Sequence, residues 1–306
     1  MLFVTYFPHL LAGPILHHKE MMPQFSNKWN FSLRWRNVSL GLFLFSIGLF
    51  KKVILADSFA VWANPGFSTE TALTLIDAWT TSLSYTLQLY FDFSGYVDMA
   101  IGMSLMFNIR LPLNFNSPYK AKDIQDFWRR WHITLSRFLR DYIYIPLGGN
   151  KVSKYRNYVN LFSVFFIGGI WHGASWMFVI WGILHGGAIV IHRIWKDFGL
   201  RMWGWLGWLI TFNFVNIAWV FFRADNLDTA QNILIGMSGL NGIGTEGLKE
   251  LAILLIFITA TVVFRNSNDM SSSFKPTRIY QILTGMLLFA GIVMLERHSD
   301  FLYFRF

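Results

Sequence analysis

Residues 157–191 are 35 consecutive residues without a Lys, Arg, Asp or Glu. As one straight helix they would extend about 52 Å, at about 1.5 Å per residue, whereas the hydrocarbon core of a bilayer is about 30 Å thick. We therefore expect the run to break at its centre, in the sequence GGIWHGAS (168–175). Broken helices at membrane depth are tolerated where they line a cavity or pack inside protein. This predicts that His172 lies in a buried pocket that can hold polar groups.

The composition favours a membrane protein. Of the 306 residues, 54% are hydrophobic and only 14% are charged, against about 25% charged in soluble domains. The net charge of +9 comes from basic residues between apolar runs, not from the exposed basic face of a nucleic-acid-binding protein, so we expect no nucleic-acid partner. With no cysteine, the chain has no disulfide, thiolate nucleophile or Cys-ligated metal.

Further apolar windows recur along the chain. The clearest is 203–222, which contains no charged side chain. Five more lie at 37–50, 78–91, 99–108, 251–264 and 279–295, and polar connectors at 238–247 and 266–277 separate the last helices. Backbone polar groups in lipid must be satisfied within the protein. The sequence therefore predicts an all-α, polytopic transmembrane bundle with broken or re-entrant helices and an internal tunnel, as a single membrane domain over 1–306.

A basic segment lies at 110–156, with ten Lys or Arg against three Asp. This excess predicts a cytoplasmic location for the segment. Inside it, Phe127, Trp131 and Phe138 fall on one stripe of an amphipathic helix, which would lie in the membrane interface rather than span it. The turn sequence PLGGN (146–150) would end this helix.

Two histidines stand out as candidates for chemistry: His172 at the expected break, and His132 in the basic segment. Ionisable groups inside a membrane are costly and often functional, and imidazole can accept and return a proton near neutral pH. The alternative is a helix-packing histidine bonded to a carbonyl, and the spacing does not decide between them. We expect His185 to pack.

Other charged and histidine patterns have structural interpretations. His185 and His192 lie seven residues apart and could ligate haem or a metal, although zinc sites rarely lack a third close ligand, so we expect no metal. Asp57, Asp92 and Asp98 are expected to act as helix caps and ion-pair partners. The chain has no Walker or Rossmann glycine pattern and no G-x-S-x-G elbow.

Several motifs carry a family resemblance. The segments QDFWRRWHITLSRFLRDYIYIPLGGN and GGIWHGASWMFVIWGILHG resemble the membrane-bound O-acyltransferase family, and within it the bacterial branch that acetylates exopolysaccharides such as alginate. The segments YFPHLLAGPILHHKEMMPQF, GLFKKVILADSFA, DFSGYVDMAIG, PLNFNSPYKAKDIQDFW and AWVFFRADNLDTA extend the resemblance over essentially the whole chain.

The resemblance implies acyl transfer from a cytoplasmic thioester, acetyl-CoA, to a hydroxyl of a cell-envelope polysaccharide or exopolysaccharide, with a periplasmic acetyltransferase partner. It implies a multi-pass protein of the bacterial inner membrane, in contact with lipid and without a bound cofactor. The family's hallmark histidine corresponds to His172 and its second polar position to His132. Donor binding is assigned to Arg129, Arg130, Trp131, Arg140, Asp141 and Asn150, because basic side chains hold phosphate groups.

The chain ends in FLYFRF, which also resembles the ending of this branch. The resemblance makes Tyr303 a candidate covalent acyl relay, activated by His172. The alternative is an interfacial aromatic anchor with Arg305 extending to the headgroups. Family members usually have helices before YFPHLLAGPI, so we expect the chain to be the C-terminal part of the usual family length; its first residues lack the features of a signal peptide.

Two other functions remain open. The first is a transport protein that exports a polymer or lipid without acyl chemistry, favoured only by the broken helix. The second is a haem-binding electron carrier that uses His185 and His192.

Overall fold

The computed structural model describes residues 2–9 and 13–295, and these form an all-helical protein with no β-strand among them. The described residues divide into two compact units. One holds 2–9, 13–60, 88–116 and 264–295, and the other holds 61–87 and 117–263. The organisation of 1–306 as a single membrane domain stays a prediction.

The complete elements of the first unit are α1 (Leu2–Thr5), η1 (Phe7–His9), α2 (His18–Phe25), η2 (Lys28–Phe31), α3 (Trp35–Phe50), the π-helix η3 (Lys51–Ala56), α13 (Ser267–Ser272) and α14 (Arg278–Val293). In the sequence, α3 runs directly into η3. Helices α4 (Asp57–Ser68) and α5 (Leu75–Met106) contribute residues to both units.

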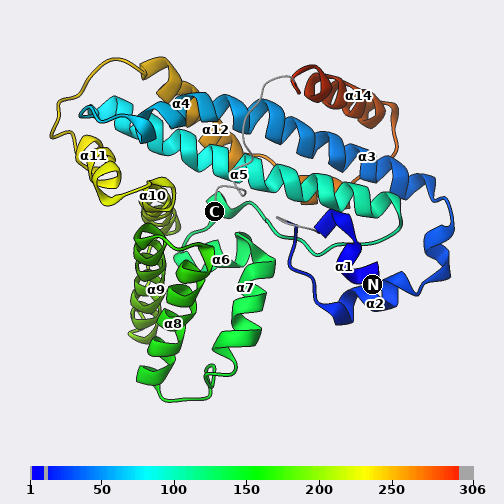
Figure 1. The fold of residues 1–306 in the computed structure, drawn as a ribbon, viewed down its shortest axis with the longest axis horizontal. Coiled ribbons are helices and arrows are strands. Elements are labelled where there is room, and N and C mark those ends of the chain that lie inside the picture. Colours follow the sequence, from blue (N-terminus) through cyan, green and yellow to red (C-terminus); the bar gives the residue numbers. More distant parts are fainter. Residues whose placement is uncertain (1, 10–12, 296–306) are drawn as a thin grey trace. The chain divides into compact units, whose positions relative to one another are not determined.

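The second unit contains the segments that the sequence singled out for chemistry (Figure 1). Its complete elements are η4 (Pro118–Lys120), α6 (Ile124–Arg130), α7 (Ile133–Leu139), the π-helix η5 (Arg140–Tyr144), α8 (Lys154–His172), α9 (Trp176–Asp197), α10 (Gly204–Arg223), α11 (Leu227–Met237) and α12 (Leu248–Val263).

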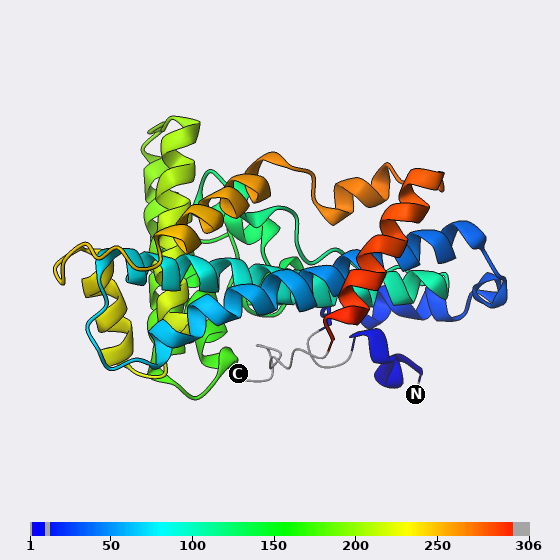
Figure 2. The ribbon, with the colours of Figure 1, turned by 90° about the horizontal axis from the view of Figure 1, so that it is seen from above.

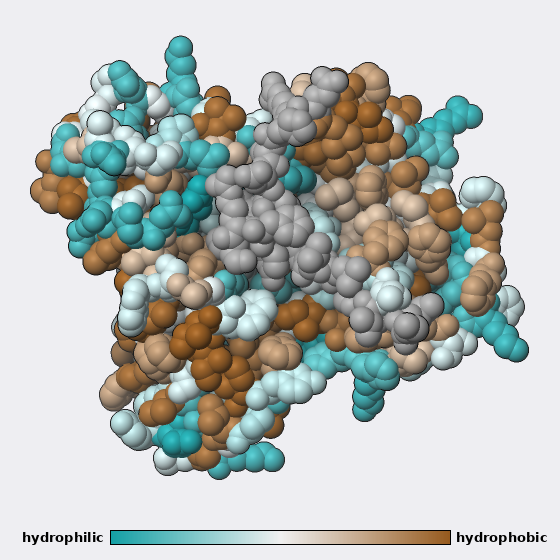
Figure 3. Space-filling view, in the orientation of Figure 1, coloured by the Kyte–Doolittle hydropathy of each residue, from teal (hydrophilic) through white to brown (hydrophobic). Residues whose placement is uncertain are grey.

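Three helical segments within the described residues are long and apolar enough to cross a membrane: Trp35–Ser68, Trp176–Asp197 and Gly204–Arg223. The apolar windows at 37–50, 203–222, 251–264 and 279–295 are confirmed as helices α3, α10, α12 and α14. Figure 3 shows hydrophobic side chains gathered over α14, where Ile279 and Phe289 are exposed. Such a surface suits contact with lipid better than contact with water.

The apolar windows at 78–91 and 99–108 belong to one helix, α5, which contains Asp92 and Asp98 in its interior. Both carboxylates pair with lysines of η3: Lys52 lies 2.7 Å from Asp92, and Lys51 lies 2.6 Å from Asp98. A paired carboxylate can stay in an apolar helix, so neither aspartate ends it.

The three aspartates are confirmed as ion-pair partners, since Asp57 also lies 2.9 Å from Lys52. Only Asp57 lies at a helix start, in the first turn of α4. The connector at 266–277 also differs from expectation, because it contains α13, whose N-terminus is capped by reciprocal Asn266 and Asp269 hydrogen bonds. The connector at 238–247 is confirmed as non-helical.

Glycines bring α3 close to α5 in the first unit. A Cβ added at Gly95 would lie 2.7 Å from the carbonyl oxygen of Gly48, and one added at Gly102 would lie 2.5 Å from that of Gly41. Figures 1 and 2 show the two helices side by side along this contact. Small residues at a crossing allow backbones to touch, which is how helices associate where no water drives them together.

Helices α8 and α9 form an antiparallel hairpin in the second unit (Figures 1 and 2). They are separated by residues 173–175, so the expected break in the uncharged run is confirmed. The Ser175 side chain caps α9 by accepting a hydrogen bond from the Met177 amide. A Cβ added at Gly182 would lie 2.6 Å from the Phe165 carbonyl oxygen, so the two helices pack with almost no space between their backbones.

Candidate active site

His172 is the last residue of α8, at the tip of the hairpin. Its ring lies edge-on to Trp181 of α9, with 5.1 Å between ring centroids, and to Phe222 of α10 at 5.0 Å. The side chain is half-buried, and the adjacent Trp171 is 49% exposed. The predicted burial of His172 is therefore partial, and aromatic rings enclose it on two sides.

His132 lies at a break that the sequence analysis missed. The expected amphipathic helix stops at Arg130 and resumes as α7 at Ile133, because His132 has φ 43° and ψ 55°. This left-handed conformation is uncommon for residues other than glycine and turns the chain. The predicted continuous stripe is therefore wrong: Trp131 lies before the turn and Phe138 after it.

The His132 side chain is held neutral. It is only 3% exposed, and burial, with a smaller contribution from His172, lowers its pKa to about 3. The influence of His172 shows that the two imidazoles lie close enough to interact electrostatically. At pH 7 His132 therefore adds a polar ring without a positive charge.

His185 packs inside the protein, as expected, but in the surroundings of His172. It is 0% exposed, and its Nδ1 accepts a hydrogen bond from Trp128 Nε1 at 3.1 Å. Trp181 joins the two histidines, since its ring centroid lies 4.8 Å from His185 and 5.1 Å from His172. Helices α6, α8, α9 and α10 thus bring aromatic and imidazole rings together in one cluster.

His192 does not share these surroundings. Its Nε2 lies 3.4 Å from an Asp123 carboxylate oxygen, whereas His185 is enclosed by aromatic rings. Within 2–9 and 13–295, no group of three or more His, Asp or Glu side chains could hold a metal ion. The structure thus adds nothing in favour of the haem alternative.

Of the predicted donor-binding residues, only Trp131 joins the ring cluster. It is buried, stacks on Phe127 with 5.8 Å between centroids, and lies 4.9 Å from the ring of Trp219. A buried tryptophan in this position shapes the cluster, and its role in donor binding stays a prediction.

The charged donor-binding candidates lie toward solvent in the second unit. Arg130 pairs with Asp126 at 2.9 Å, and Arg140 pairs with Asp141 at 2.7 Å. Arg129 and Asn150 are exposed. Surface ion pairs of this kind contribute little stability, so these side chains can exchange partners for phosphate groups at little cost. Tyr303 falls outside the described residues.

Four aromatic residues of the cluster were not found by the sequence analysis: Trp128, Trp181, Trp219 and Phe222. Trp181 stands four residues before His185 on α9, which places both on one helix face, and this spacing was the available signal. Trp219 and Phe222 lie within a uniformly apolar window, where one aromatic residue cannot be told from another by pattern.

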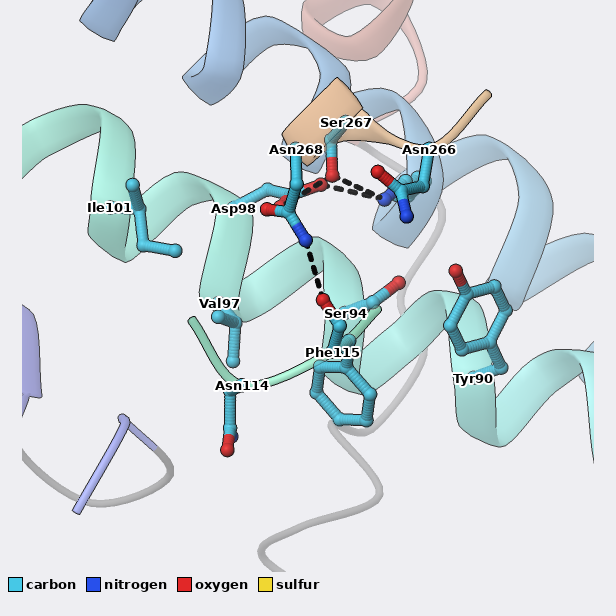
Figure 4. Close-up of a pocket in the computed structure, with 11 residues that line it drawn as sticks. Tyr90, Ser94, Val97, Asp98, Ile101, Asn114, Phe115, Asn266, Ser267 and Asn268 are labelled. Carbon is cyan, nitrogen blue, oxygen red and sulfur yellow. Dashed lines mark hydrogen bonds and ion pairs between the residues drawn. The ribbon is translucent and has the colours of Figure 1, made fainter. Parts of the chain in front are cut away.

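A second polar cluster lies in the first unit (Figure 4). Ser267 donates a hydrogen bond to Asp98 at 2.9 Å, and Asp98 is paired with Lys51. Figure 4 shows Asn268 directed at the backbone of Phe115, whose carbonyl oxygen accepts its hydrogen bond. The cavity beside them has a volume of about 10 Å³, which holds about one water molecule. The side chains form a structural ion-pair network, and the cavity is too small for a substrate.

Comparison with known proteins identifies the family of the chain. The model of the family described as MBOAT, membrane-bound O-acyltransferase family, matches residues 1–227. A peptidoglycan O-acetyltransferase of Helicobacter pylori is 58% identical over 279 residues, covering 90% of this chain and 53% of that protein. A probable alginate O-acetylase AlgI of Pseudomonas putida is 38% identical over 333 residues, covering 99% and 68%.

A teichoic acid D-alanyltransferase of Bacillus subtilis is 27% identical over 229 residues, covering 70% of this chain and 58% of that protein. The chain spans between about half and two thirds of the length of these three relatives. The family match covers most of the chain, including His132 and His172 with the helices that carry them. The chain belongs to the membrane-bound O-acyltransferase family.

Proposed function

We propose that the protein transfers an acetyl group from a thioester donor to a hydroxyl of a cell-envelope polysaccharide, with His172 as general base. The observation that carries the proposal is the place of His172: a half-buried imidazole at a helix break, enclosed by Trp181 and Phe222. The relatives named as peptidoglycan O-acetyltransferase and alginate O-acetylase support the acetyl group and the polysaccharide acceptor.

The chemistry needs one proton carrier and a reachable carbonyl carbon. A nitrogen of His172 takes the proton of the acceptor hydroxyl as its oxygen attacks the thioester carbonyl carbon. The C–S bond of the tetrahedral intermediate then breaks, and the thiolate takes the proton back from the imidazolium. The products are an O-acetyl ester and a free thiol, and His172 is returned unchanged.

His132 supports this cycle by remaining neutral. Because its pKa is lowered to about 3, it adds no positive charge beside His172 when His172 becomes an imidazolium. A second cation at short range would oppose that protonation. Its neutral ring can also accept a hydrogen bond from a substrate.

Acetyl-CoA is the proposed donor, entering from the cytoplasmic face of the inner membrane. The exposed or surface-paired arginines Arg129, Arg130 and Arg140 are the proposed contacts for its phosphates, since guanidinium groups bind phosphate well. The protein is proposed to span this membrane several times and to work with a periplasmic acetyltransferase partner. Acyl relay through Tyr303 remains part of the proposal.

Peptidoglycan is the first acceptor to test. The peptidoglycan O-acetyltransferase is 58% identical to this chain, while an alginate O-acetylase AlgI of Pseudomonas aeruginosa is 45% identical over 250 residues. Both polymers offer secondary or primary hydroxyls to the same base. The comparison therefore favours peptidoglycan without a change in mechanism.

Membranes that contain the chain are incubated with radiolabelled acetyl-CoA, and label is followed into peptidoglycan, alginate and the C-terminal peptide. We expect transfer that is lost in His172→Ala. Equal transfer by that variant would remove His172 from the mechanism. A transport protein would instead move polymer with no acetylated product, and label on Tyr303 by mass spectrometry would establish the relay.

A further inference from the structure

Three buried N–H groups beside His172 have no acceptor in the part of the chain that the structure describes. They are the Nε1 of Trp181, the Nε1 of Trp219 and the Nε2 of His185. Their side chains are 2%, 1% and 0% exposed. A buried donor without an acceptor is costly, and lipid supplies no water to satisfy it. Native proteins seldom retain such groups unless a ligand or water uses them.

The proton on His185 can be assigned from its neighbour. An indole N–H can only donate, and Trp128 Nε1 donates to Nδ1 of His185 at 3.1 Å. Nδ1 therefore carries a lone pair, and the neutral ring has its proton on Nε2. In this state the Nε2–H of His185 is a hydrogen-bond donor, and the ring is not a base.

The three rings adjoin one another, and one of them adjoins His172. The ring centroids of Trp181 and His185 are 4.8 Å apart, those of Trp181 and Trp219 are 6.0 Å apart, and those of His185 and Trp219 are 6.2 Å apart. Trp181 also lies 5.1 Å from His172. The unsatisfied donors are thus concentrated where the reacting groups would meet.

Contacts with ring faces are the simpler explanation for such donors. Trp219 lies edge-on to Phe222 at 77°, and His185 lies edge-on to Phe214 at 82°. Interactions of an N–H with an aromatic ring are second-order contributions, well short of a hydrogen bond to oxygen. They do not explain why three such donors gather in the ring cluster that contains His172.

We propose that Trp181, Trp219 and His185 donate hydrogen bonds to the carbonyl oxygen of the acyl group transferred at His172, an inference that rests on the proposed function. When the hydroxyl oxygen attacks, the C=O π electrons move onto that oxygen, and they re-form the double bond when the C–S bond breaks. The three donors keep their protons throughout. Donors already fixed in a dry site stabilise this negative charge without reorganising.

The first test removes the N–H groups and keeps aromatic rings, in Trp181→Phe and Trp219→Phe. The control is Trp208→Phe in α10, because Trp208 Nε1 has an acceptor, the Tyr119 carbonyl oxygen at 2.8 Å. We expect kcat for acetyl transfer to fall about 10²-fold in each test variant, with KM for acetyl-CoA changed less than about threefold. A merely structural role would leave kcat per folded molecule unchanged.

Shape and hydrogen bonding are separated by replacing Trp219 with benzothienylalanine, in which sulfur takes the place of the indole N–H. We expect this protein to be as thermally stable as the wild type, because the removed donor has no protein acceptor, and to be as impaired in kcat as Trp219→Phe. A rate within about twofold of wild type would overturn the proposal.

A second measurement does not need turnover. A ¹³C-carbonyl ketone analogue of acetyl-CoA, with a methylene between sulfur and the carbonyl carbon, is bound to each protein, and its C=O stretch is recorded by infrared spectroscopy. Hydrogen bonds should lower this frequency in wild type and Trp208→Phe, with the shift reduced in the benzothienylalanine protein. An equal frequency in all three would overturn the proposal. If wild type and His172→Ala transfer no acetyl group, the proposed function fails while the infrared shift still decides the donors.

Discussion

The α3–α5 contact of the first unit, with the adjoining η3, and the ring cluster of the second unit both bury polar side chains. These side chains have partners in the first region, whereas several lack them in the second. At the contact, Lys51 and Lys52 are matched with Asp98 and Asp92 at 2.6 and 2.7 Å. In the ring cluster, buried donors such as Trp219 Nε1 lack acceptors within the described residues. A matched ion-pair network stabilises the fold, whereas buried donors without acceptors can be used by a ligand or by water.

The His172→Ala variant tests most directly whether the ring cluster serves chemistry rather than the fold. We expect acetyl transfer to fall about 10⁴-fold, the upper range for loss of a general base, with little loss of thermal stability, because the ring is only half-buried and meets Trp181 and Phe222 edge-on. Transfer and melting temperature are measured on the same membranes. A stability loss as large as that of a core variant would place His172 in the fold and not in the chemistry.

Removing one partner of the ion-pair network should mainly reduce stability, the opposite of the result expected for His172→Ala. In Asp98→Ala, Lys51 is left as a buried charge without its carboxylate, and the free energy of unfolding should fall by about 3–5 kcal/mol. The control is Asp141→Ala, which breaks a pair whose arginine is exposed and should cost about 0–1 kcal/mol. Equal losses in the two variants, measured by denaturation in detergent, would contradict the assignment of the α3–α5 contact as structural.

The glycine contact between α8 and α9 should affect both stability and acetyl transfer, because it sets the position of His172. In Gly182→Ala the new methyl would lie 2.6 Å from the Phe165 carbonyl oxygen, so the helices must separate, at a cost of about 1–3 kcal/mol. Acetyl transfer should fall as well. Gly187→Ala, on the same helix, has open space for its methyl and should retain both stability and activity; a loss in this control would show that α9 tolerates no added methyl.

The smallest expected effect is on pH dependence. The pKa of His132 is about 3 in the folded protein and about 6.5 in an unfolded chain. Below pH 6.5 the unfolded state binds a proton that the native state does not, so this group makes stability fall as pH decreases toward 3. The His132→Asn variant should lose less stability from pH 6 to pH 5, by about 1 kcal/mol. Parallel stability curves would show that His132 is accessible to protons.

The uncharged run and the Asp pattern show what could be predicted. The run at 157–191 was expected to break near His172 because its length exceeds one membrane crossing, and it does break at 173–175. The apolar windows on either side of Asp92 and Asp98 gave no sign that they form one helix. The lysine partners of these aspartates lie 40 and 47 residues earlier in the chain, and no local pattern shows such pairing.

The candidate site was likewise predicted only in part from the sequence. His172 and His132 could be singled out by local context, but the left-handed conformation of His132 could not, since the flanking residues read as one amphipathic helix. The expectation that His185 packs was correct, but its hydrogen bond with Trp128 depends on the approach of α6 to α9. The internal tunnel, the donor contacts and the role of Tyr303 stay predictions.

Apolar length and charge spacing, both local properties of the chain, were enough to determine that it is helical, that it suits a membrane, and that one helix is interrupted beside a histidine. Tertiary structure alone decided which buried polar groups are matched and which are not, because a hydrogen bond or ion pair depends on distances between residues far apart in sequence. The pairing of Lys51 with Asp98 and the unsatisfied N–H of Trp219 are both consequences of packing.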